Sequence, residues 1–78
     1  MEEKIKEIMG RIFEIDPMTI NEDSSPDNIE KWVSLKHMVL IVDLEEEFGT
    51  TFREDEIVQM LSYKIIYDTI QSKSQQKN

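Results

Sequence analysis

The longest uninterrupted helical pattern in this chain runs from Ser34 to Phe48, and it constrains the fold more than any other stretch. At about 100° per residue, one face of this helix gathers apolar side chains and the only histidine, which predicts that it faces a core. These residues are His37, Leu40, Ile41, Leu44 and Phe48. A second stripe, well round from the first, holds Leu35, Val39 and Val42. Because three large apolar residues share this stripe, it predicts a docking surface for another protein.

The chain is 78 residues long, which predicts one small domain without a deep active-site cleft. It contains no cysteine, so disulfides, thiolate metal sites and thiol nucleophiles are excluded. The single histidine, His37, excludes a site with several histidine ligands, and the acids lack the spacing of a calcium-binding EF-hand loop. Since neither a nucleophile–base pair nor a metal set is recognisable, we expect no catalytic residues and no metal site, and therefore not an enzyme.

Acidic residues outnumber basic ones by 17 to 9, which gives a net charge of −8. This charge disfavours nucleic acid and anionic membranes as partners and favours proteins with basic surfaces. Seven acids lie between residues 43 and 56, with Arg53 as the one base among them. The longest apolar run, Met38 to Val42, is too short to span a membrane, and no signal-peptide pattern opens the chain. We therefore expect a cytoplasmic monomer that does not insert into membranes.

The first part of the chain, residues 2–14, predicts another helix. Apolar residues repeat there at helical spacing, namely Ile5, Ile8, Met9 and Ile12. The pattern stops before Pro17, because the residue that precedes a proline is pushed out of the helical region. Gly10 inside this helix costs about 1 kcal/mol relative to alanine, so we expect it to permit close packing against a neighbouring segment.

A long connection over residues 15–33 separates the first helix from the central one. It is rich in turn-forming residues, and Asp16-Pro17 predicts a single helical turn with aspartate as its cap. A connection of this length in a compact domain is either functional or mobile. Ile20 and Ile29 are expected to pin it to the core, and Trp32 to pack over the start of the central helix.

Two further helices are expected after Gly49, which is a natural C-cap for the central helix. The run from Thr51 to Glu54 has the pattern of a capping box and leads into a short helix over residues 55–60. Ser62 is predicted to cap a last helix over residues 63–72. In that helix Ile66 and Ile70 are predicted to face inward.

Together these segments predict an all-α fold. Three main helices and a short third one would form a small four-helix bundle with a long first loop, in a single domain over residues 1–78. Residues 71–78 contain no apolar side chain and no acid, so their end is expected to fray.

Several of these features, taken in order, resemble the acyl carrier proteins, and the resemblance covers nearly the whole chain. It rests on the opening amphipathic helix, on Trp32-Val33-Ser34-Leu35 at a helix start with Ile29 just upstream, and on the run Leu44-Glu45-Glu46-Glu47-Phe48-Gly49, which is highly typical of the family. The later Phe52-x-Glu54-Asp55-Glu56 and the last helix also fit. Ser-Leu alone would carry no information, but the whole arrangement is specific.

The resemblance implies that Ser34 is the hydroxyl to which a phosphopantetheinyl transferase attaches 4′-phosphopantetheine from coenzyme A. The thiol of that arm would carry acyl or aminoacyl groups as thioesters. The protein would then present intermediates of fatty-acid, polyketide or related biosynthesis to acyl-transferring and acyl-modifying enzymes with basic docking patches. A phosphodiester at a helix N-terminus is physically reasonable, because free N–H groups and the helix dipole favour an anion there.

The chain departs from the family where an Asp-Ser-Leu motif is usual, because Val33 precedes Ser34. In the family the aspartate helps to engage the transferase and its metal. In addition, this chain has Lys36 and Val39 at two positions that are commonly acidic in fatty-acid carriers. This difference favours a specialised carrier over a general one. The predicted partner-binding residues are Leu35, Lys36, Val39, Val42, Glu45, Glu46, Glu54 and Asp55.

Two alternatives stay open on the sequence alone. In the first, Ser34 serves only as the N-cap of its helix, which is the commonest use of a serine at a helix start. The altered motif also allows an unmodified interaction module that docks to a partner and carries no prosthetic group. The acyl chain of a modified carrier is expected to lie between helices, toward Ile41, Leu44, Ile57 and Leu61.

Overall fold

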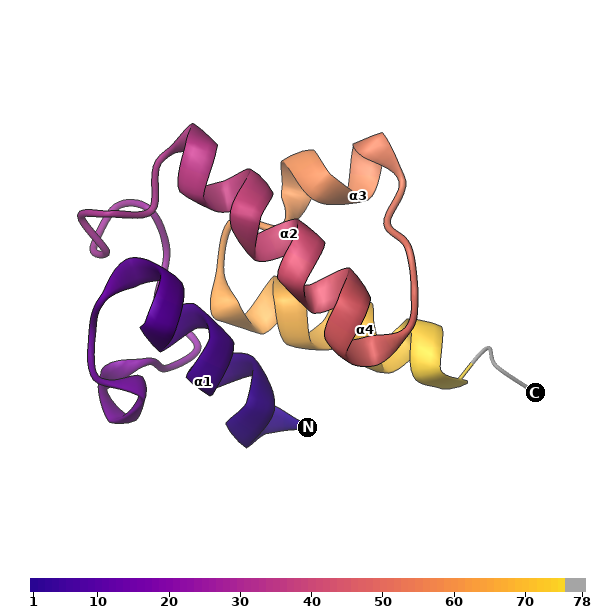
Figure 1. Ribbon diagram of the computed structural model, residues 1–78, viewed down its shortest axis with the longest axis horizontal. Helices are drawn as coiled ribbons and strands as arrows, with labels where there is room; N and C mark the ends of the chain where they lie inside the picture. The colour runs from indigo at the N-terminus through magenta and orange to yellow at the C-terminus, as the bar shows by residue number, and fades with distance from the viewer. Residues whose placement is uncertain (76–78) are drawn as a thin grey trace.

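The computed structural model describes residues 1–75 and shows four α-helices and one 3-10 turn (Figure 1). Helix α2 runs diagonally across the middle of the molecule, with the other elements around it. No strand occurs in the described residues, so the predicted all-α bundle with a long first loop is confirmed. The elements are α1 (Glu2–Phe13), η1 (Pro17–Thr19), α2 (Ser34–Phe48), α3 (Glu54–Gln59) and α4 (Tyr63–Gln75).

The two predicted faces of α2 are both present. On its core face Leu40, Ile41 and Leu44 are buried, and so is His37. Phe48 is partly buried and packs against the same core. The opposite stripe is open, and Leu35 on it is 75% exposed. Gly49 ends the helix in the left-handed conformation with φ 61°, as a C-cap glycine does.

Helix α1 packs against α2 and against η1. Gly10 lies where the chain turns back over this helix. A Cβ atom on Gly10 would stand 2.8 Å from the carbonyl oxygen of Ile15 and 2.8 Å from Cγ of Pro17. This confirms the predicted close packing, because no larger residue fits without a shift of the returning chain. Asp16 caps η1 as predicted, since its side chain accepts a hydrogen bond from Met18 N at 2.9 Å.

The long first loop is held to the helices at several points. Ile20 and Ile29 are buried, as predicted. Ser24 is also buried, and its carbonyl oxygen accepts a hydrogen bond from the backbone N–H of Tyr63 at 3.0 Å. That bond ties the middle of the loop to the first residue of α4. Trp32, at the end of the loop, is buried and stacks on Phe13 with ring centroids 5.0 Å apart.

The third helix, α3, begins at Glu54, one residue before its predicted range of 55–60, but the capping box predicted at Thr51 is wrong. Its N-cap is Arg53 rather than Thr51, and the Arg53 backbone N–H donates to the Glu56 carboxylate at 2.8 Å. The reason is the burial of Phe52, whose backbone N–H donates to the side chain of Glu45 at 2.9 Å. This contact holds the chain in a non-helical conformation at Phe52, so no helical turn begins at Thr51.

The last helix is capped by Ser62 as predicted, because the Ser62 hydroxyl accepts a hydrogen bond from Ile65 N at 3.1 Å. Its predicted end near Ser72 is wrong, since α4 continues to Gln75 and into the stretch expected to fray. Lys73 explains the extra length, because its ammonium group lies 2.9 Å from the Glu56 carboxylate on α3. The remainder of the predicted frayed tail, residues 76–78, lies outside the described residues.

Tyr63 places a polar group in the core. Its side chain is buried, and its hydroxyl has no hydrogen-bond partner within residues 1–75. Burial, with a smaller contribution from the charge of Glu2, raises the pKa of Tyr63 to about 12. The folded protein therefore favours the neutral phenol more strongly than the unfolded chain does.

This pKa makes the folded state sensitive to alkali. The stability due to neutral Tyr63 is complete below pH 10 and is lost as the pH rises toward about 12. We expect the urea midpoint of the wild-type protein to fall more steeply over this range than that of Tyr63→Phe, which has no phenol to ionise. Equal slopes for wild type and Tyr63→Phe would contradict the prediction.

Candidate functional site

Ser34 is the first residue of α2 and not its cap. The N-cap is Val33, which is extended and makes no side-chain capping bond. The first bond of the helix runs from His37 N–H to the Val33 carbonyl oxygen at 2.8 Å. The alternative in which Ser34 serves as the N-cap is therefore wrong.

The hydroxyl of Ser34 makes no hydrogen bond within residues 1–75, unlike the hydroxyls of Ser24, Ser25 and Ser62. Ser24 accepts a hydrogen bond from Asn21 N at 2.9 Å, Ser25 accepts one from Asp27 N at 3.2 Å, and Ser62 caps α4. For Ser34 Oγ no hydrogen bond is found within residues 1–75, and the residue is exposed. Its hydroxyl thus has no structural use there and is accessible to another protein.

The start of α2 favours an anion. The amides of the first turn have no acceptor within the helix, and no side chain caps them. The turn contains no acidic residue, and Lys36 adds a positive charge to it. The positive end of the helix dipole is therefore not offset by a carboxylate on the same turn. A phosphate ester on Ser34 would be stabilised by this environment.

His37 joins the start of α2 to the loop before it and to α3. Its Nδ1 accepts a hydrogen bond from Trp32 Nε1 at 2.9 Å, and its Nε2 lies 2.9 Å from the Ile57 carbonyl oxygen. Because an indole N–H can only donate, Nδ1 must be the acceptor and Nε2 must carry the proton. Both ring nitrogens are thus engaged. This agrees with the packed position predicted for His37, and it leaves neither nitrogen available as a base for Ser34.

A cleft of about 420 Å³ opens beside Ser34, and we call it the Ser34 cleft. The surface that lines it is mostly apolar. Two of the lining side chains are well exposed, Val33 by 57% and Leu61 by 46%. The six lining residues are Pro26, Trp32, Val33, Ser34, His37 and Leu61. Sequence patterns did not identify Pro26 or Trp32 as part of the site. Leu61 was expected among residues that would contact an acyl chain, but its companions Ile41 and Leu44 are fully packed in the core.

The apolar residues predicted for partner binding are all exposed on one side of α2. We call Leu35, Val39 and Val42 the docking stripe. Val39 and Val42 each expose a little less than half of their surface, and Leu35 exposes more than either. Met38, which the helical pattern did not single out, is exposed beside them.

The charged residues predicted for partner binding differ in their exposure and in whether they already bind another group of the protein. Glu46 and Glu54 are exposed, whereas Lys36 is half-buried. Glu45 is half-buried and accepts the hydrogen bond from Phe52 N, so one of its oxygens is committed to the fold. Asp55 is exposed but paired with Arg53, and the hydrogen bond from this guanidinium lowers the pKa of Asp55.

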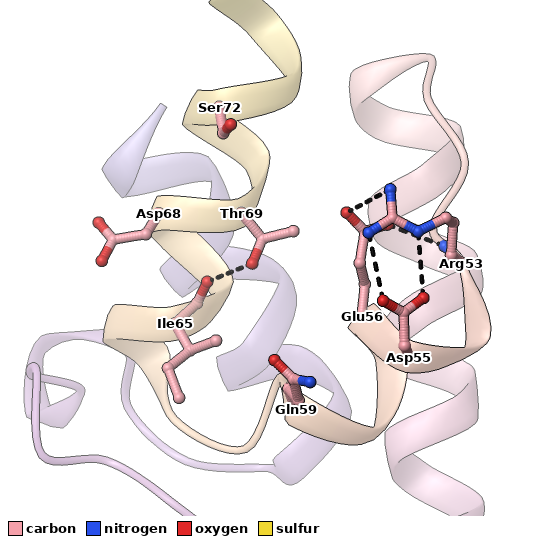
Figure 2. Close-up of a pocket in the computed structure, with 8 residues that line it drawn as sticks. All are labelled: Arg53, Asp55, Glu56, Gln59, Ile65, Asp68, Thr69 and Ser72. Atoms are coloured by element: carbon pink, nitrogen blue, oxygen red, sulfur yellow. Dashed lines mark hydrogen bonds and ion pairs between the residues drawn. The ribbon is translucent and has the colours of Figure 1, made fainter.

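A second concavity lies between α3 and α4 (Figure 2). Figure 2 shows that Arg53 reaches both Asp55 and Glu56, and that Thr69 hydrogen-bonds to Ile65 within α4. The Arg53 backbone N–H, and then Lys73, lower the pKa of Glu56. Arg53, Asp55 and Glu56 are paired within this pocket, and Asp68 is paired with Lys64 outside it, so the pocket offers less to a charged ligand than the surroundings of Ser34.

Within residues 1–75 no three acidic or histidine side chains approach closely enough to hold a metal ion. None of the helices over that range combines the length and the apolar character needed to cross a bilayer. Comparison of the sequence with known protein families and with curated proteins gives no match.

Proposed function

We propose that this protein is an acyl carrier protein whose prosthetic group is attached to Ser34. The observation that carries the proposal is the exposed Ser34 hydroxyl, which no hydrogen bond engages within residues 1–75, on the first residue of a helix whose first turn contains no acidic residue. The resemblance of nearly the whole chain to the acyl carrier proteins supports the same conclusion.

Ser34 takes part in the attachment as a nucleophile. Its oxygen forms a bond to the pantetheine-bearing phosphorus of coenzyme A, the pyrophosphate bond breaks, and the adenosine bisphosphate portion leaves. The serine proton passes to the phosphopantetheinyl transferase, because His37 has both nitrogens engaged. The amides of the first turn then stabilise the phosphodiester. The arm supplies a thiol that holds an acyl or aminoacyl group as a thioester, so the absence of cysteine from the chain is no obstacle.

Partner enzymes are proposed to bind along α2. The docking stripe provides the apolar contact, and Glu46 and Glu54 provide exposed negative charge beside it. An enzyme with a basic rim around an apolar patch matches this surface. Lys36 near Ser34 is proposed to distinguish this carrier from general fatty-acid carriers, because a basic partner residue at that point would be repelled.

The proposal is tested by intact-mass measurement after incubation with coenzyme A, magnesium and a phosphopantetheinyl transferase. We expect a gain of one phosphopantetheine, and its complete loss in Ser34→Ala. Ser62→Ala is the matched control, since Ser62 also lies at a helix start, and it should be modified at the wild-type rate. Modification of Ser34→Ala at another residue would contradict the assignment.

Val33 motivates the second candidate, an interaction module that docks without a prosthetic group. Absence of any mass gain with several transferases, the cognate one included, would favour it. Val33→Asp restores the acid that is usual in the family, and exposure of Val33 means that the fold should tolerate it. A faster reaction of Val33→Asp with a general transferase would show that Val33 restricts which transferase modifies the protein.

A further inference from the structure

We infer that the Ser34 cleft binds the root of the attached arm, namely the dimethyl-substituted carbon next to its phosphate, against Val33 and Leu61. This inference rests on the proposed function and concerns where the arm lies once it is attached. A mobile arm that leaves the protein surface directly at Ser34 is the opposing arrangement.

The position of the cleft selects the part of the arm that can reach it. Ser34 is itself one of the lining residues, so a group on its oxygen begins at the edge of the cleft. After the phosphate, the arm continues with a methylene and then a carbon that bears two methyl groups. The polar hydroxyl and amides come later. The bulkiest apolar part of the arm therefore lies only a few bonds from Ser34, and its attachment gives it a high effective concentration at the cleft.

The chemistry of the walls agrees with an apolar occupant. The two polar rings that line the cleft have used their hydrogen-bonding atoms, because Trp32 Nε1 donates to His37 Nδ1 and His37 Nε2 bonds to Ile57. They offer the cleft carbon surfaces only. Val33 and Leu61 expose apolar area that nothing within residues 1–75 covers. A dimethyl group that covers these side chains removes apolar surface of both partners from water.

In this arrangement the side chain of Val33 contributes directly to binding the arm. An aspartate at this position would place a charge in the wall of the Ser34 cleft, where an approaching methyl group would take water from it. Valine instead extends the apolar wall up to Ser34 itself. The residue that departs from the usual family motif is thus the residue that would hold the arm at its root.

The inference is tested by NMR on protein labelled with ¹³C and ¹⁵N and modified with unlabelled coenzyme A, with complete modification verified by intact mass. We expect nuclear Overhauser effects between the two arm methyls and the methyl groups of Val33 and Leu61. Leu61→Ser should abolish them. Leu35→Ser makes the same chemical change on the docking stripe and should leave them intact. Circular dichroism verifies that both variants are folded.

Each outcome bears on a separate claim. Complete modification without these Overhauser effects, with sharp arm signals typical of free motion, would overturn the inference and leave the proposed function standing. Loss of the effects in Leu35→Ser as well as Leu61→Ser would also overturn it. Failure of Ser34 to be modified by any transferase would overturn the proposed function, and the inference with it.

Discussion

Trp32→Ala is expected to lower the free energy of unfolding by about 3–5 kcal/mol, a loss comparable to the whole stability of many small domains. Trp32 is buried and stacks on Phe13 of α1, so its removal leaves a large cavity. It also leaves Nδ1 of His37 without the hydrogen bond that the indole donates. Urea unfolding followed by circular dichroism measures the effect, because the variant has no tryptophan fluorescence.

Two further variants separate packing from hydrogen bonding. Trp32→Phe keeps an aromatic ring but removes the donor, and we expect a smaller loss of about 1–3 kcal/mol. Leu35→Ala is the control, since this exposed residue should change stability by no more than about 0.5 kcal/mol. A loss below about 1 kcal/mol for Trp32→Ala would show that the long loop contributes little to the folded state.

Gly10→Ala is expected to destabilise the protein by about 1–3 kcal/mol, although alanine is the better helix former by about 1 kcal/mol. The new methyl group would stand 2.8 Å from a backbone oxygen, that of Ile15, which cannot move alone because Ile15 N also donates to the Gly10 carbonyl oxygen. Thermal unfolding of Gly10→Ala and Gly10→Val should show a progressive loss, with valine the less stable.

Glu3→Ala provides the comparison for Gly10→Ala, because it introduces the same side chain at an exposed position of α1. It should change stability by no more than about 0.5 kcal/mol. An increase in stability for Gly10→Ala would mean that the returning chain moves away from α1 at little cost.

Helical periodicity was sufficient to predict both faces of α2, because burial along a helix follows directly from residue spacing. Element ends were less predictable, since they depend on contacts between distant residues. The cap of α3 lies at Arg53 rather than Thr51 because Phe52 is bonded to Glu45, and α4 is extended by the pairing of Lys73 with Glu56. Neither contact leaves a periodic signal in the sequence.

The candidate site was predictable in part. Ser34 was identified by the surrounding motif and was predicted to begin the central helix, but the structure was needed to show that Val33 is the N-cap and that the Ser34 hydroxyl does not cap the helix. The Ser34 cleft was not predictable, because Pro26 and Leu61 belong to segments far apart in the chain. The commitment of Glu45 and Asp55 to internal partners likewise required side-chain positions.

The bond from Tyr63 N–H to the Ser24 carbonyl oxygen joins the two segments from which Pro26 and Leu61 project. Because this bond is made by the main chain alone, replacing a side chain in the cleft does not remove it. The spacing of the two segments and the chemistry of the lining can therefore vary independently during evolution. A substitution in the lining, for example at Val33, is therefore expected to change the chemistry of the Ser34 cleft and leave the width of the cleft the same.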